Sequence, residues 1–208
     1  MARYAGPVCR ICRREGGKLF LKGERCFSEK CSYDKREYAP GEHKGARRKL
    51  SEYGEQLREK QKLKRTHFLM EKQFKKTYKT CEKMKGITGE NLLSLLERRL
   101  DNAIYTLGFA PSRKAARLLI THGHFLVRGK KVNIPSYILK PGDDISVIEK
   151  TKKSEIINNA LESAMRRTRP AYYEIDRDAY KGTIGNIPER DEITSAVNEK
   201  LIVELYSK

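Results

Sequence analysis

The sequence has no run of apolar residues close to the roughly 18 that a membrane-spanning helix needs. We also expect no secretory signal, because Cys9, Arg10 and Arg13 occupy the positions of its apolar stretch. Acidic residues are few: 27 Asp and Glu stand against 45 Lys and Arg, so the 208-residue chain has a formal net charge of +18. This charge disfavours a typical metabolic enzyme, whose small substrate does not need such a field, and favours a polyanionic partner such as nucleic acid.

The positive charge is concentrated in the first 85 residues. Residues 1–50 and 51–85 have net charges of +8 and +6, whereas residues 151–208 contain ten basic and ten acidic side chains. Leu, Phe and Tyr recur among the basic residues, so this part is expected to fold rather than to form a tail. Because binding of phosphates to such a surface releases counterions, we expect its affinity for nucleic acid to fall steeply with added salt.

Four of the five cysteines form two close pairs, Cys9-x2-Cys12 and Cys26-x4-Cys31, separated by 13 residues. Two pairs at this spacing are typical of a tetrahedral zinc site, in which four thiolates leave no open position for catalysis. The segment 1–45 has too few apolar residues to fold by itself. One structural Zn²⁺ would supply the missing folding free energy.

Other interpretations of these residues remain open. The two pairs could form disulfides, which a reducing compartment disfavours. His43 could replace one cysteine as a zinc ligand. Cys81 stands alone in a helical pattern and is expected to be a small packing residue.

The apolar periodicity predicts an α+β fold. Ser51 and Ser112 are expected to cap helices at their N-termini, and Gly108 is expected to end a helix that begins near Thr88. Short strands would form a small, mostly antiparallel sheet. One or two helices are expected over 51–81, and further helices over 88–107, 112–123, 154–167 and 193–205. Strands are expected at 125–127, 132–134, 145–148, 172–175 and 183–184.

The stretch from Arg99 to Ser136 resembles a small RNA-binding module, the αL-type domain named after the fourth protein of the small ribosomal subunit. RNA-modifying enzymes and a tyrosyl-tRNA synthetase family also contain this module, so by itself it indicates only a structured RNA partner. The resemblance is based on Arg99-Leu100-Asp101, Ser112-Arg113-x2-Ala116-x2-Leu119-Ile120, Gly123, Val127-x-Gly129-x2-Val132 and Pro135-Ser136.

Further motifs extend the resemblance to nearly the whole chain. They are Arg3-Tyr4-x-Gly6-Pro7, Ala39-Pro40-Gly41, Tyr53-Gly54-x-Gln56 through Lys62, Thr88 through Leu92, and Leu201 through Lys208. The chain is therefore identified as a member of the bacterial-type family of small-subunit ribosomal protein four, in its zinc-binding form. It departs from the family at His67-Phe68, where Tyr-Gly is usual and a helix glycine is expected to be lost, and at Tyr172-Tyr173, where Trp-Leu is common.

The resemblance implies three regions in the α+β chain. They are a zinc-binding segment over 1–45, a basic helical domain over 46–91 with a C-terminal helix at 188–208 packed on it, and an RNA-binding domain over 92–187 with its core motif at 99–157.

The resemblance also implies a function without enzymatic activity. The chain would be a structural constituent of the small ribosomal subunit and a primary binder of its rRNA at a junction in the 5′ domain. It would nucleate assembly, line the channel through which mRNA enters and support translational accuracy with small-subunit protein five. Some relatives repress their own mRNA. The location would be the cytoplasm of a bacterium, or an organelle of bacterial descent, on the ribosome.

Folded RNA is recognised mainly by shape, phosphates and 2′-hydroxyl groups, which suits basic side chains on a rigid surface. The amides at the start of the helix after Ser112 could face a phosphate, although Arg113, Lys114 and Arg117 could also be only a solvated face. The residues expected to contact rRNA are Arg3, Tyr4, Arg10, Arg13, Arg14, Lys18, Lys22, Arg58, Lys62, Lys72, Lys76, Ser112, Arg113, Lys114 and Arg117. Those expected to face mRNA are Arg47, Arg48 and Lys49.

Three alternative functions use the same features. An rRNA-modifying enzyme would need a separate catalytic domain, for which the chain has no room, and a Gly-rich cofactor loop, which it lacks. A zinc-containing DNA-binding regulator would need a recognition helix and a dimer seam, and neither has a signature here. A heat-shock or ribosome-rescue factor with the module would lack the cysteine cluster and the basic helices.

Overall fold

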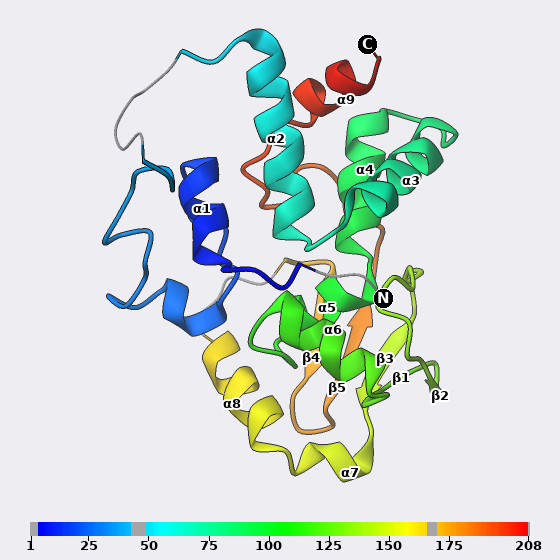
Figure 1. The fold of residues 1–208 in the computed structure, drawn as a ribbon. Coiled ribbons are helices and arrows are strands. Elements are labelled where there is room, and N and C mark those ends of the chain that lie inside the picture. Colours follow the sequence, from blue (N-terminus) through cyan, green and yellow to red (C-terminus); the bar gives the residue numbers. More distant parts are fainter. Residues whose placement is uncertain (1–3, 43–48, 166–169, 208) are drawn as a thin grey trace. The chain divides into compact units, whose positions relative to one another are not determined.

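The computed structural model describes residues 4–42, 49–165 and 170–207, which fall into two units (Figure 1). The first unit comprises the described residues up to Leu92 and those from Ser195 onward, and the second runs from Leu93 to Thr194. The first is helical, and the second contains a five-stranded sheet with helices, so the expected α+β class is confirmed. Among the described helices, none is both long enough and apolar enough to cross a membrane.

The helices of the first unit begin and pack largely as the sequence predicts. The Ser51 Oγ accepts a hydrogen bond from the Gly54 N–H at 3.2 Å and caps the helix that follows. One face of the next helix buries Phe74, Tyr78 and Cys81, which are three or four residues apart. The elements are α1 (Cys9–Glu15), the 3-10 helix η1 (Gly23–Cys26), α2 (Glu52–Thr66), α3 (Glu71–Glu82), the start of α4 (Thr88–Glu97) and α9 (Glu199–Ser207).

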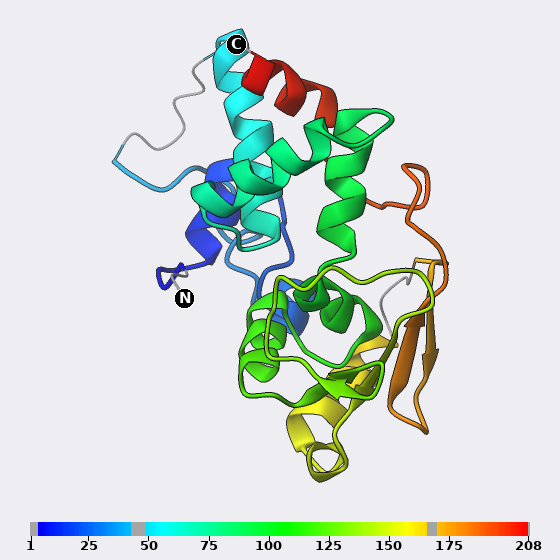
Figure 2. The same ribbon diagram turned by 90° about the vertical axis from the view of Figure 1, so that its right-hand side faces the viewer.

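α9 packs against α2, and the two helices lie side by side (Figures 1 and 2). The helix predicted over 188–208 is longer than the one observed. The backbone before α9 bonds to α2 side chains instead: the Lys62 Nζ donates to the Ala196 carbonyl at 2.7 Å, and the Asn198 N–H donates to the Glu59 carboxylate at 3.0 Å. Because these backbone groups have partners on α2, they do not continue the helix toward the N-terminus.

A small apolar core supports the cysteine segment, and Phe68 belongs to it. Phe68 follows the end of α2 with φ at +51°, a left-handed conformation that costs a non-glycine residue roughly 1–2 kcal/mol. Burial of its ring recovers roughly 1.5–3 kcal/mol, since the residue is only 7% exposed. The expectation that Phe68 replaces a helix glycine is wrong, because the position lies in the turn before α3. The buried residues of this core are Val8, Ile11, Cys12, Leu19, Leu21 and Phe68.

The second unit contains a sheet with strand order β2-β1-β3-β5-β4, in which each neighbouring pair is antiparallel (Figure 1). Arg128 and Gly129 both have positive φ and form a two-residue hairpin turn. This tight turn places the second hairpin strand at 130–131, earlier than the predicted 132–134. The strands are β1 (Phe125–Val127), β2 (Lys130–Lys131), β3 (Asp144–Val147), β4 (Tyr173–Asp176) and β5 (Lys181–Ile184).

The single helix predicted over 88–107 is divided in the structure. α4 ends at Glu97 and α5 spans Leu100–Leu107. Between them Arg99 has extended backbone, with ψ at 138°, and forms a β-bridge with Ile138. Pairing with this distant loop removes Arg99 from a helical conformation, and no local sequence signal reports that pairing.

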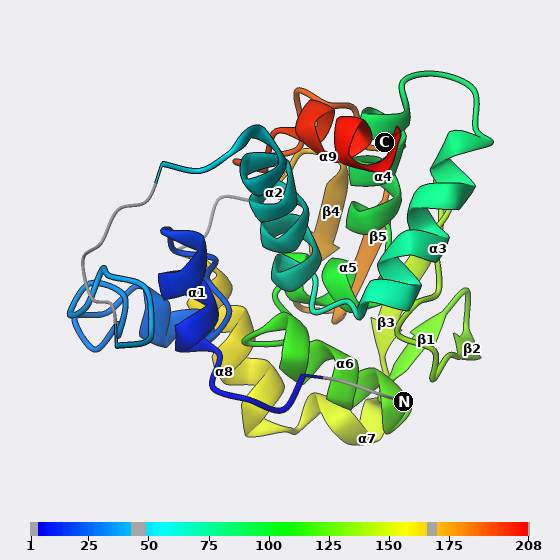
Figure 3. The same cartoon turned by 45° about the horizontal axis from the view of Figure 1, so that its top comes forward.

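The helices of the second unit pack with the sheet around one apolar core. α5 lies beside β4 (Figure 3) and ends at Gly108, whose φ is +92°. A Cβ at Gly108 would lie 2.5 Å from the Cβ of Ala164, so only glycine fits both the backbone conformation and the close contact. The other helices are α6 (Arg113–Thr121), α7 (Glu149–Lys152) and α8 (Glu155–Ala164).

One carboxylate connects α2, α3 and α9 of the first unit. Glu71 accepts hydrogen bonds from the Nζ atoms of Lys60 and Lys64, both at 2.7 Å, and from the Tyr206 hydroxyl at 3.2 Å. Burial disfavours the charged carboxylate, but the two lysine hydrogen bonds outweigh it and lower the pKa of Glu71 from 4.5 to about 2. The ionised group therefore adds stability above about pH 4.5, and this contribution is lost as the pH falls through about 2.

We expect Glu71→Gln to weaken the loss of stability between about pH 4.5 and 2, because the variant has no carboxylate to protonate there. Thermal unfolding measured at a series of pH values checks this. Glu55→Gln, a change at an exposed glutamate of α2, is the control and should keep the profile of the unmodified chain. A Glu71→Gln profile identical to that of the control would contradict the assignment.

Candidate metal centre and RNA-binding surface

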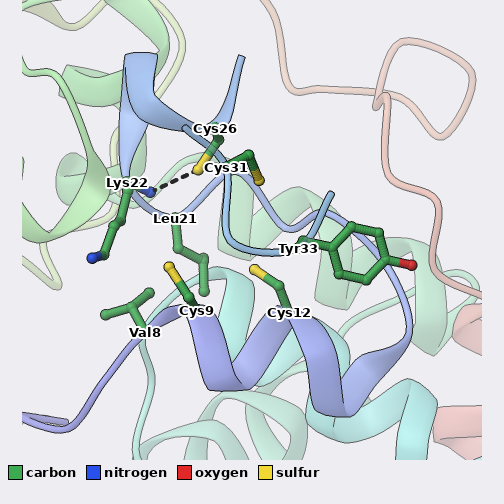
Figure 4. A pocket seen from close by; sticks show the side chains of 8 residues that line it. All are labelled: Val8, Cys9, Cys12, Leu21, Lys22, Cys26, Cys31 and Tyr33. Carbon is green, nitrogen blue, oxygen red and sulfur yellow. Dashed lines mark hydrogen bonds between the residues drawn. The ribbon is translucent and has the colours of Figure 1, made fainter. Parts of the chain in front are cut away.

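Four cysteine side chains line one pocket in the first unit (Figure 4). α1 presents Cys9 and Cys12, which are three residues apart and so lie on the same face of the helix. Cys26 and Cys31 approach from the opposite wall (Figure 4). The Lys22 N–H donates a hydrogen bond to the Cys26 Sγ at 3.3 Å, which joins η1 to the loop before it. The structure thus brings together the four cysteines that the sequence singles out.

The cysteines of this pocket form no disulfide bond. All five cysteines of the chain lie within the described residues and are free, so the alternative of two disulfides is not found. Burial raises the pKa of the Cys12 thiol, against a hydrogen bond from the Leu19 backbone. Burial likewise raises the pKa of Cys26, against the hydrogen bond from Lys22. A thiolate in this pocket therefore needs a nearby cation to be stable.

The four sulfurs suit zinc in their chemistry, because four thiolates are a common tetrahedral set for this ion. In the part of the chain that the structure describes, however, no group of three or more Cys, His, Asp or Glu side chains is arranged so that it could hold a metal ion. The four cysteines therefore line one pocket, but their sulfur atoms are not arranged as a complete set of metal ligands. His43, the alternative ligand, lies outside the described residues.

Glu15, at the end of α1, connects the cysteine segment to α2. Its side chain is 1% exposed and forms ion pairs with Arg58, at 3.4 Å, and with Arg65. Burial raises the pKa of Glu15, while the two guanidinium groups act against this rise. Sequence reasoning missed Glu15 because its partners are more than 40 residues away. Arg58, an expected rRNA contact, is therefore held in an internal ion pair.

Several other basic side chains that we expect to contact rRNA form hydrogen bonds or ion pairs with residues of the first unit. Arg13 donates from Nε to the Tyr38 carbonyl at 2.9 Å, and its guanidinium lies 4.9 Å from the centre of the Tyr38 ring. The remaining pairs are Arg14 with the Pro40 carbonyl, Lys18 with Asp34, and Lys62 with Glu59 and the Ala196 carbonyl. These contacts orient the side chains, and their contact with rRNA stays a prediction.

A second set of expected rRNA residues is exposed. Lys72 and Lys76 lie with Lys75 and Lys79 on the outer side of α3, away from the buried aromatic face of that helix. None of the four forms a side-chain hydrogen bond or ion pair with another described residue. We call this surface the α3 lysine face. The other exposed members of the set are Arg10, Lys22 and Lys114.

The start of α6 has the expected cap, because the Ser112 Oγ accepts a hydrogen bond from the Ala115 N–H at 3.2 Å. The basic side chains that follow do not all face solvent. The Arg113 Nε donates to the Asn102 Oδ1 at 2.6 Å, whereas Lys114 is exposed. The interpretation of these side chains as a purely solvated face is therefore wrong for Arg113.

Arg117 belongs to a buried cluster around Asp101. The Asp101 carboxylate accepts hydrogen bonds from Arg99, at 2.9 and 3.1 Å, and from the Arg117 Nε at 3.0 Å. The side chains of Arg99 and Asp101 are each 4% exposed, and that of Arg117 is 12% exposed. Arg117 is thus mainly a structural residue in this unit. The sequence showed the Arg99-Leu100-Asp101 motif. It did not show that Arg117, 16 positions after Asp101, is the second arginine bonded to the Asp101 carboxylate.

The remaining site predictions concern the N-terminus and the basic loop. Arg3, Arg47 and Arg48 lie outside the described residues. Tyr4 is exposed, and its hydroxyl donates to the Pro7 carbonyl at 3.5 Å. Lys49 is exposed.

Comparison with known proteins gives one consistent result. Residues 3–97 match the family model described as the ribosomal protein S4/S9 N-terminal domain, and residues 98–145 match the S4 domain. Relatives named small ribosomal subunit protein uS4 are found in Syntrophotalea carbinolica, with 58% identity, and in Citrifermentans bemidjiense and Thermoanaerobacter pseudethanolicus, each with 55% identity. Each of these alignments covers 100% of both chains.

The Asp101 cluster predicts different roles for neighbouring residues of α6. Arg117→Ala should lower the free energy of unfolding by roughly 3 kcal/mol, because it removes one partner of a buried ion pair. Lys114→Ala, the matched control on the same helix, should change it by no more than about 0.5 kcal/mol. Unfolding in urea measures both values, and equal effects of the two substitutions would contradict the assignment.

Proposed function

The chain belongs to the family of small ribosomal subunit protein uS4, a structural and non-enzymatic constituent of the ribosome with an S4 RNA-binding domain, and from this premise we propose that it is a primary binder of small-subunit rRNA. It binds a junction in the 5′ domain of that RNA and nucleates assembly of the subunit. The α3 lysine face is the observation that carries this proposal, because four exposed lysines on one rigid helix suit a row of phosphates. Membership of the family over the whole chain disfavours the enzyme, the DNA-binding regulator and the rescue factor.

Within this proposal the two units have different tasks. Most of the net charge of +18 lies in the first 85 residues, which belong to the first unit, so that unit supplies most of the phosphate contacts. The S4 domain has its two arginines of α6 bonded inward, and there Lys114 and the start of the helix remain for RNA. The S4 domain therefore contributes more to the orientation of the chain on the RNA than to the neutralisation of phosphates.

Further roles follow from family membership. We propose that Arg47, Arg48 and Lys49 line the channel through which mRNA enters, and that the charge-balanced C-terminal part contacts small-subunit protein five and so supports translational accuracy. Repression of its own mRNA fits the same RNA-binding surface. The relatives are bacterial, and this supports the proposal that the chain works on ribosomes in a bacterial cytoplasm.

We propose that the cysteine pocket holds one structural Zn²⁺. Cys9, Cys12, Cys26 and Cys31 would be its ligands, drawn from the two walls of the pocket toward a common centre. The ion would keep the four sulfurs deprotonated and would cross-link α1 to the loops around η1. This support fits a segment whose described residues contribute five buried side chains to a small apolar core.

The rRNA proposal is tested by footprinting the chain on protein-free small-subunit rRNA and by titrations at several salt concentrations. The double variant Lys72→Ala/Lys76→Ala should bind more weakly, and the slope of log K against log salt should fall by about 1–2, since two phosphate contacts are removed. The control Lys150→Ala/Lys153→Ala removes equal charge from exposed lysines around α7 and should keep the slope. Protection of no specific rRNA region would overturn the proposal.

The zinc proposal is tested by elemental analysis of the purified chain, with about one zinc per chain expected. Cys26→Ser should lower the zinc content and make residues 4–42 more sensitive to protease, and a strong chelator should do the same to the unmodified chain. Cys81→Ala, a change at the cysteine outside the pocket, is the control and should keep its zinc. Less than about half a zinc per chain would contradict the proposal.

A further inference from the structure

Two phenylalanines form an exposed aromatic pair on the cysteine segment. The rings of Phe20 and Phe27 stack with their centres 4.8 Å apart and an angle of 25° between their planes. Phe20 is 37% and Phe27 is 59% exposed. The other four phenylalanines of the chain, Phe68, Phe74, Phe109 and Phe125, are at most 7% exposed. A large apolar ring in water is unfavourable, so this pair differs from every other phenylalanine of the protein.

The fold holds both rings outward. Phe20 lies between Leu19 and Leu21, which are buried in the apolar core of the segment, so its own side chain faces away from that core. Its φ of +49° is a left-handed conformation that a phenylalanine rarely adopts. Phe27 directly follows the buried Cys26 of the pocket. The hydrogen bond from Lys22 to the Cys26 sulfur ties together the two chain segments from which the rings project.

The surroundings of the pair are charged rather than apolar. Lys22 follows Phe20 by two residues and Arg25 precedes Phe27 by two, and both are exposed. The exposed residues Glu24 and Glu29 are also near in sequence, but residues 18–30 still contain four basic and two acidic side chains. Among residues 18–30, Phe20 and Phe27 are the exposed large apolar side chains. Two rings are enough for one flat aromatic ligand, whereas a stable protein interface buries about 800 Å² on each partner.

From this arrangement we infer that Phe20 and Phe27 form a stacking platform for an unpaired base of RNA, with Lys22 and Arg25 placed to contact the phosphates on either side. A base offers a flat aromatic face for the outer ring, Phe27, and its backbone offers the negative charge that the two cations fit. The inference rests on the proposed function, because it assigns a specific contact within the binding of rRNA. It assigns a role to two residues that carry no charge and that the basic pattern of the sequence does not indicate.

The test uses the full chain and protein-free small-subunit rRNA. Phe27→Ala and Phe27→Leu should each weaken binding about tenfold, because both remove the ring. Since stacking releases no counterions, the factor should be the same at every salt concentration and the salt slope should stay unchanged, unlike the effect of a lysine substitution. Ile87→Ala, at a residue 63% exposed in the same unit, is the control and should bind as the unmodified chain does.

Phe27→Trp gives an independent readout, because the chain contains no other tryptophan. This variant should bind as tightly as the unmodified chain, and rRNA should quench its fluorescence, while an Ile87→Trp control should not be quenched. Far-ultraviolet circular dichroism and zinc content check that the Phe27 variants retain the fold of the segment.

Each other outcome overturns the inference in a distinct way. If the unmodified chain binds rRNA and Phe27→Ala binds equally well, the platform is wrong and the proposed function stands. If the unmodified chain binds no rRNA, both fail. If Phe27→Trp is quenched only after other small-subunit proteins are added, the pair contacts a protein and not a base.

Discussion

A few carboxylates determine which of the many cations of this chain are left for a partner. In the first unit Glu15 binds two arginines of α2, and Glu71 binds Lys60 and Lys64. In the second unit Asp101 binds two arginines. With a net charge of +18, a compact fold must limit repulsion among its own cations, and pairing a carboxylate with two cations does this where chain segments meet. The cations without such partners, above all those of α3, are the ones that we propose for contact with phosphates.

The cysteine segment combines a pocket lined by four cysteines with an exposed pair of aromatic rings. The pocket that the four cysteines line also includes Leu21 and Lys22, so the two chain segments from which Phe20 and Phe27 project contribute to its walls. With a small apolar core, this segment gains order from cross-links more than from burial, and these are the ion pairs of Glu15, the hydrogen bond to the Cys26 sulfur and the proposed zinc ion. A rigid platform loses less conformational entropy when it binds, so the order of the pocket would also favour the binding of RNA.

Local sequence signals predicted the helix caps and a helix end, where the cause was local. The caps at Ser51 and Ser112 are side-chain contacts to residues three positions later, and the stop at Gly108 depends on one backbone conformation. The predictions failed where a distant segment intervened. Arg99 leaves the helical pattern because it pairs with Ile138. The chain before α9 leaves it where the Ala196 carbonyl and the Asn198 N–H bond to side chains of α2. Helical spacing is a weak preference that such contacts override.

The candidate site shows the same division between sequence and structure. The sequence by itself determined the family, the α+β class, the basic N-terminal half and the four cysteines, because spacing, composition and charge are properties of the chain before it folds. Only the tertiary structure decided that Arg117 points inward to Asp101 while Lys114 stays exposed, and that Phe20 and Phe27 meet in solvent. The free energy of an ion pair or a stacked ring depends on distances of a few ångströms, and these are set only when remote segments pack together.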